Sequence, residues 1–165
     1  MAGAGASLAA IVRPTVTTYV RMVNLPACSR CILLAGRSYR METAFRRHPK
    51  CDCRHIPTVE NLAGDVTTDP TAAFRTLTTE QQDRIFTKAG AQALRDGADM
   101  SRVVNARSGM SSAQVGGRRL RTTTAGPRRR GMVRLMPESI YDLAGGDRKE
   151  ALRLLQVHGY ITRAI

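Results

Sequence analysis

The sequence has few aromatic residues and few acidic ones, and each shortage narrows what the protein can be. The 165 residues include no tryptophan, and aromatic residues make up 4% of the chain. A core with so little aromatic surface is modest for this length, so we expect a second stabilising device such as a bound metal. The 13 acidic residues are outnumbered by 26 lysines and arginines, which gives a net charge of +13. Such an excess favours nucleic acid or an acidic protein surface as the partner.

Long apolar runs are also missing from the sequence. The opening MAGAGASLAAIV is small and apolar, but it is too short to span a bilayer and lacks the basic residues of a secretion leader. We therefore expect no membrane partner, and an environment in which thiols stay reduced. Reduced thiols favour metal binding over disulfides.

All four cysteines lie in one window of the sequence, as two close pairs. One is a C-x-x-C pair at 28–31 and the other a C-x-C pair at 51–53. His48 precedes the second pair, and the following Pro49 favours an extended backbone at this histidine. Zinc prefers thiolate and imidazole ligands in a tetrahedron, and a pair at either spacing can bind one ion. The sequence predicts a structural zinc site whose candidate ligands are Cys28, Cys31, His48, Cys51 and Cys53.

Other interpretations of the cysteines stay open. They can be buried structural thiols, or they can form a disulfide or a redox-active pair. The redox interpretation leaves the second pair and His48 without a role. A catalytic zinc site is the weaker metal hypothesis, because the local carboxylates, Glu42 and Asp52, have no spacing that indicates a role.

The region before residue 108 predicts a mixture of strand and helix. Residues 15–23, TVTTYVRMV, are rich in β-branched side chains and predict a strand. Residues 78–97 predict the best helix of the chain, capped at Thr78 or Thr79 and stopped at Gly97. A short helix or strand is expected around 32–35.

The remaining helix signals lie later in the chain. Asp99 starts a short helix, and Pro137 suits the first turn of another. Asp147 caps a last helix, which Gly145–Gly146 separates from the one before. We expect these last two helices to form a hairpin.

Residues 109–132 differ sharply in composition from the rest. They are rich in Gly, Ser, Thr and Arg and contain few large apolar side chains. Such a chain buries too little surface to offset the entropy of ordering, so we predict a flexible basic linker. Its arginine runs can pair with DNA phosphates: Arg118, Arg119, Arg121, Arg128, Arg129 and Arg130. The alternative is a solvated linker that contacts nothing.

These signals predict an α+β fold: a small zinc-stapled domain with a short β-sheet and flanking helices, followed by the linker and the helix hairpin. The predicted parts are an N-terminal arm at 1–14, the α+β domain at 15–108, the linker at 109–132 and the hairpin at 133–165.

Several of these motifs resemble those of a known family. From about Thr15 to Met110 the chain is similar to the Mu-type phage head morphogenesis family, also called minor capsid or minor head proteins. CSRCILLAGRSY resembles the C-x-x-C stretch of that family, and HPKCDC resembles its H-P-x-C-x-C signature. Two later stretches, QQDRIFTKAGAQALRDGADMSRVVNARSGM and RLMPESIYDLAGGDRKEALRLLQVHGYI, resemble the version found in tailed phages of actinobacteria.

The resemblance implies a structural role without catalysis. It implies a minor protein of the phage head that assists capsid assembly and lies in the capsid interior or at the portal, after passing through the host cytoplasm during assembly. The implied partners are the portal protein, the major capsid protein, or both, with packaged double-stranded DNA in addition and no small-molecule substrate. One rival is a free-standing zinc-ribbon DNA-binding protein. Another is a zinc-dependent nuclease or other hydrolase, for which few carboxylates and histidines are suitably placed.

Overall fold

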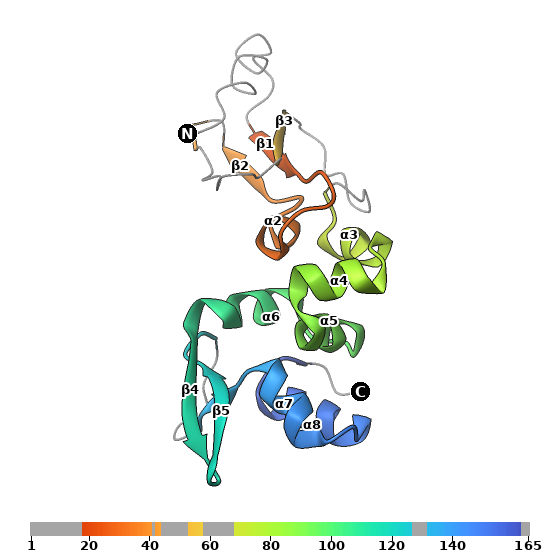
Figure 1. Ribbon diagram of the computed structural model, residues 1–165. Helices are drawn as coiled ribbons and strands as arrows, with labels where there is room; N and C mark the ends of the chain where they lie inside the picture. The colour runs from red at the N-terminus through yellow and green to blue at the C-terminus, as the bar shows by residue number, and fades with distance from the viewer. Residues whose placement is uncertain (1–17, 41, 44–52, 58–67, 127–131, 163–165) are drawn as a thin grey trace. The chain divides into compact units, whose positions relative to one another are not determined.

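The computed structural model describes residues 18–40, 42–43, 53–57, 68–126 and 132–162. The described residues form an α+β fold with two three-stranded antiparallel sheets and seven α-helices (Figure 1). The chain divides into two units, 1–81 and 82–165. The division falls inside the range 15–108 that the sequence predicts as one domain.

The first unit is built on the strand that the sequence predicts at 15–23. The strand β1 (Thr18–Met22) is the centre of an antiparallel sheet, with β2 (Ser38–Arg40) on one side and β3 (Arg54–Pro57) on the other. Tyr19 pairs with Tyr39 of β2, and their rings stack with centroids 5.5 Å apart. Neighbours on both edges leave the middle of β1 buried.

A short helix follows β1 where the sequence predicts a helix or strand. The helix α2 (Ser29–Leu33) ends in a turn at Gly36, where φ is 73°. The Gly36 N–H donates to the Arg21 carbonyl oxygen at 2.9 Å, which ties the turn to β1. A Cβ atom at Gly36 would lie 1.9 Å from the carbonyl oxygen of Thr68. Glycine is therefore required here both by conformation and by space.

Local capping signals position the next helices. Asp69 caps α3 (Pro70–Thr76), with its Oδ1 accepting from the Thr71 N–H at 2.7 Å. The predicted cap at Thr78 is confirmed, and it forms a capping box with Gln81. The Thr78 N–H donates to Gln81 Oε1 at 2.9 Å, and the Gln81 N–H donates to Thr78 Oγ1 at 3.3 Å.

The helix predicted over 78–97 is interrupted. It consists of α4 (Thr79–Phe86) and α5 (Lys88–Arg95), with Thr87 between them at a φ of 67°. This conformation is unfavourable for a β-branched residue. Two contacts hold it: Thr87 Oγ1 accepts from the Gly90 N–H and lies 3.2 Å from a Glu138 oxygen. A contact 51 residues away in the chain thus replaces the continuous helix that local periodicity predicts.

The predicted caps of the later helices are confirmed. Asp99 caps α6 (Met100–Ala106), which a single 3-10 turn extends over Arg107–Gly109. Pro137 opens α7 (Pro137–Ala144), and Asp147 caps α8 (Arg148–Val157). The two last helices pack together as the predicted hairpin. The core of the second unit combines them with α5, α6 and the sheet, through the buried residues Ala93, Val103, Ala106, Leu120, Leu135, Met136, Ile140, Leu155, Tyr160 and Ile161.

Most of the range predicted as a flexible linker is an ordered β-hairpin. The strands β4 (Met110–Val115) and β5 (Arg118–Thr123) pair along their whole length, and β6 (Arg134–Leu135) adds to the far edge of β5. The Gly116–Gly117 turn has positive φ at both residues, as a two-residue hairpin turn requires. The prediction of a flexible linker is wrong for 110–123, because it was based on the low apolar content. Leu120 and two threonines of β5 are buried, and the strand pairing satisfies the backbone.

No helix among the described residues is both long enough and apolar enough to cross a membrane.

Candidate functional site

The first pair of predicted ligands sits at the start of α2. Cys28 is the N-cap residue, and its Sγ accepts from the Cys31 N–H at 3.4 Å. The sulfur atoms of Cys28 and Cys31 are 3.3 Å apart, too far for a disulfide, whose bond is about 2.05 Å. Cys31 is buried and Cys28 is exposed. The first turn of α2 thus brings two thiols together.

Arg21 links this pair to Cys53 of the second cysteine pair. It is the fourth of the five residues of β1 and is 4% exposed. Its Nη2 lies 3.5 Å from Cys31 Sγ and 3.4 Å from Cys53 Sγ. Cys53, which directly precedes β3, is 1% exposed. Two buried thiols that are 22 residues apart in the chain therefore converge on one guanidinium nitrogen.

The positive charge of Arg21 and the negative charge of a neighbouring thiolate favour each other. Burial lowers the pKa of Arg21, but the hydrogen bond and negative charge of Cys53, with smaller contributions from Tyr39 and Cys31, raise it above its usual value overall. A neighbouring guanidinium in turn favours the thiolate form of a cysteine, which is the form that binds metals. Sequence reasoning missed Arg21. The available signal was a charged residue in the middle of the otherwise apolar stretch YVRMV at 19–23.

The donor chemistry of the described cysteines suits zinc, which prefers soft thiolate ligands. Two thiolates on one tetrahedral zinc lie about 3.8 Å apart, close to the 3.3 Å between Cys28 and Cys31. Within the described ranges, however, no three Cys, His, Asp or Glu side chains are grouped so as to hold an ion. The candidates His48 and Cys51 lie outside those ranges.

The arginines predicted to contact DNA are divided by the strand β5. Arg118, Arg119 and Arg121 are all exposed, and the side chains of Arg119 and Arg121 share one face because residues two apart in a strand do so. Arg118 is on the opposite face with the buried Leu120. The other predicted arginines, Arg128, Arg129 and Arg130, lie outside the described residues.

A buried polar cluster joins β6 to the end of the chain. Arg134 is 3% exposed, and its guanidinium carbon lies 4.1 Å from the centre of the Tyr160 ring. Its Nε donates to the His158 carbonyl oxygen at 2.8 Å, and Nη1 donates to the Ala125 carbonyl oxygen. The His158 Nδ1 accepts from the Leu135 N–H at 3.3 Å. These contacts connect the hairpin, β6 and the segment after α8.

Burial shifts the pKa values of this cluster. Burial, with the positive charges of Arg134 and Arg153, lowers the pKa of His158 and keeps its imidazole neutral. Neutral His158 matches its role as an acceptor. Burial, partly offset by Arg134, raises the pKa of Tyr160 to about 12. The cluster therefore consists of one buried cation, a neutral imidazole and a neutral phenol, an arrangement that stabilises the second unit.

A second polar network lies between α5 and the last two helices. Asp96 is hydrogen-bonded by the Tyr141 hydroxyl at 2.7 Å, by Gln92 Nε2 at 3.2 Å and by Arg148 Nε at 3.2 Å. Burial, followed by the hydrogen bond to Asp96, raises the pKa of Tyr141 well above its usual value. These residues line a cavity of about 220 Å³. Three donors bind the Asp96 carboxylate, so this carboxylate connects the end of α5 to α7 and α8.

Comparisons with known proteins add no relative to this description. No family model matches the chain, and no curated protein or solved structure is significantly similar to it.

Proposed function

We propose that this protein is a minor structural protein of a tailed-phage head that assists capsid assembly. It works inside the capsid or at the portal, through contacts with the portal protein or the major capsid protein, and it touches the packaged DNA. The motif resemblance described above supports the phage assignment. The ordered, strongly basic second unit supports DNA as an additional partner.

The proposal includes a zinc ion that staples the first unit. Cys28, Cys31 and Cys53 would bind it, with Cys51 or His48 as the fourth ligand. When bound, the ion would cross-link α2 to the segment before β3, and so stabilise a unit with a small apolar core. Arg21 would donate N–H bonds to the ligand sulfurs and offset their negative charge.

One observation carries this interpretation: Cys31 and Cys53 are buried and converge on Arg21. A thiolate cluster neutralised by a buried guanidinium suits a closed structural site. A hydrolytic zinc needs an open position and a general base. The convergence therefore supports a closed structural zinc site over a hydrolytic one.

The head assignment is tested by mass spectrometry of purified virions from the phage that encodes this chain. We expect its peptides at low copy number beside those of the portal and capsid proteins. Emptied heads that have lost their DNA serve as a comparison for proteins bound to the shell. If the protein is abundant in infected cells but missing from virions, the head assignment is wrong.

The basic hairpin favours one alternative, a free-standing zinc-ribbon DNA-binding protein that acts in the infected cell. This alternative predicts binding to a preferred DNA sequence and no protein in virions. The virion experiment separates the two directly.

A further inference from the structure

The hairpin of β4 and β5 has two unlike faces. One face carries Ala113, Val115, Leu120 and Thr122 and packs on the core of the second unit. The other carries five exposed side chains, all of them polar or charged except the first: Met110, Ser112, Gln114, Arg119 and Arg121. We call this second set the outer face. Figure 1 shows the ribbon of β4 and β5 beside α7 and α8 of the same unit.

The side chains of the outer face are held close together. Ser112 pairs with Arg121 across the ladder, and Gln114 pairs with Arg119. Arg119 also reaches diagonally, with Nε and Nη2 each 3.2 Å from Ser112 Oγ. Arg119 and Arg121 are spaced about 7 Å apart along the strand. The face thus presents two guanidinium groups with hydroxyl and amide donors between them.

No carboxylate among the described residues forms an ion pair with the arginines of this face. The sequence from Met100 to Pro137 contains nine arginines and no aspartate or glutamate. In the described part of the second unit, the ion pairs involve other arginines, such as Arg95 with Asp83 and Arg153 with Glu150. Among those same residues, Arg119 and Arg121 have no acidic partner. Exposed arginines without carboxylates are the main feature of a phosphate-binding surface.

We infer that the outer face binds the phosphate backbone of duplex DNA, with Arg119 and Arg121 as the charged contacts and Ser112 and Gln114 as neutral donors. Serine and glutamine side chains commonly donate to phosphate oxygens. A two-stranded ribbon also fits the major groove, which is about 12 Å wide. The inference rests on the proposed function for its choice of DNA over other polyanions. It predicts binding without sequence preference, because phosphates carry no sequence information.

The test measures binding of the full chain, purified under reducing conditions, to a 20-base-pair duplex of random sequence at several salt concentrations. The double variant Arg119→Gln/Arg121→Gln removes two charges from the outer face. We expect its affinity to fall roughly 10- to 100-fold near 0.1 M salt, and its log–log salt slope to decrease by about 1.8. Arg119→Lys/Arg121→Lys keeps both charges and should retain most of the salt slope.

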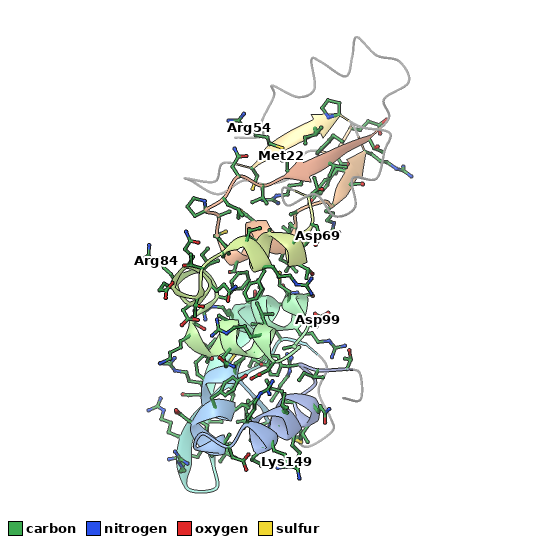
Figure 2. The ribbon with its side chains drawn as sticks, turned by 90° about the vertical axis from the view of Figure 1, so that its right-hand side faces the viewer. Met22, Arg54, Asp69, Arg84, Asp99 and Lys149 are labelled. Atoms are coloured by element: carbon green, nitrogen blue, oxygen red, sulfur yellow. The ribbon has the colours of Figure 1, made fainter. Side chains whose placement is uncertain are left out.

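The matched control is Arg84→Gln/Lys149→Gln, which removes the same charge from exposed positions on α4 and α8 (Figure 2). Thermal melting of every variant confirms that it is folded. If the outer-face variant loses no more affinity than this control, the inference is wrong. It is also wrong if polyglutamate binds the wild-type chain as tightly as DNA does, and if Arg119→Gln/Arg121→Gln weakens both interactions equally. The outer face would then suit an acidic protein.

This experiment and the virion experiment can fail separately. If the chain is missing from virions but the outer-face variant loses DNA binding, the head assignment fails and the binding face stands. If the chain is present in virions and the variant binds DNA normally, the reverse holds.

Discussion

Replacing Arg134 tests whether one buried cation holds the second unit together. Arg134→Met keeps much of the aliphatic volume but removes the guanidinium. The His158 and Ala125 carbonyl oxygens then lose their donor, and Tyr160 loses a cation 4.1 Å from its ring. Hydrogen bonds from a charged donor contribute about 1.5–3 kcal/mol each, and a buried cation–π contact about 2 kcal/mol.

The cost of burying the guanidinium works against these contributions. Burial lowers the pKa of Arg134, and the nearby charge of Arg102 lowers it further, although Tyr160 opposes this. Methionine relieves that desolvation, which is several kcal/mol for a buried ion. We therefore expect a net destabilisation of about 2–4 kcal/mol, because one buried and one partly buried carbonyl oxygen lose their donor.

Thermal unfolding followed by circular dichroism measures this loss. For a unit of this size the expected fall in melting temperature is roughly 10–20 °C. Arg153→Met is the control, since Arg153 is exposed and its ion pair among the described residues is with Glu150 on its own helix, so its loss should change the melting temperature little. If Arg134→Met melts like the wild type, the cluster has no stabilising role and the reasoning is wrong.

Three further changes test other parts of the structure. Because the pKa of His158 is lowered in the folded state, the second unit should have full stability above about pH 6.5 and lose stability as the pH falls below that value. Melting curves recorded at several pH values should show a weaker dependence on pH in His158→Asn, which keeps an acceptor for the Leu135 N–H. An equal dependence on pH in both proteins would contradict the assignment. Gly36→Ala should destabilise the first unit by roughly 1–3 kcal/mol or more in denaturant titrations, since its Cβ would lie 1.9 Å from the Thr68 oxygen, whereas Gly97→Ala, with open space around its Cβ, should cost less. Arg21→Leu should weaken zinc binding about 10- to 100-fold in competition with a chromophoric chelator, with Arg21→Lys in between, and unchanged affinity would remove Arg21 from the site.

Local signals predicted the parts of the fold that depend on neighbours in the sequence. The capping box at Thr78 and Gln81, and the helix starts at Asp99, Pro137 and Asp147, depend on residues no more than three positions apart. Their chemistry is visible without any tertiary structure. The strand at 15–23 was predicted for a similar reason, because its β-branched composition is a local property.

Long-range contacts account for what sequence reasoning missed. The sequence around Thr87 does not predict its contact with Glu138, which holds Thr87 in the conformation that separates α4 from α5. Composition predicts a linker where the hairpin lies at 110–123, although Gly116–Gly117 between two six-residue runs is a recognised hairpin signal.

The candidate site was predicted in part. Clustering along the sequence identified the cysteines as a group, and the structure brings Cys28 next to Cys31 and places Cys31 and Cys53 around Arg21. The role of Arg21 depends on tertiary contacts, because β2 and β3 pair with both edges of β1 and its guanidinium contacts two distant cysteines. The roles of His48 and Cys51 stay predictions, since both lie outside the described residues.

The most direct test of the central claim is the zinc content of the full chain, purified under reducing conditions, with a count of reactive thiols before and after chelation. The account predicts one zinc ion per chain, few reactive thiols before chelation, and four reactive thiols with loss of the folded first unit afterwards. A folded protein that contains no zinc and has four freely reactive thiols would contradict the zinc staple, and would leave the motif resemblance as the support for the head assignment.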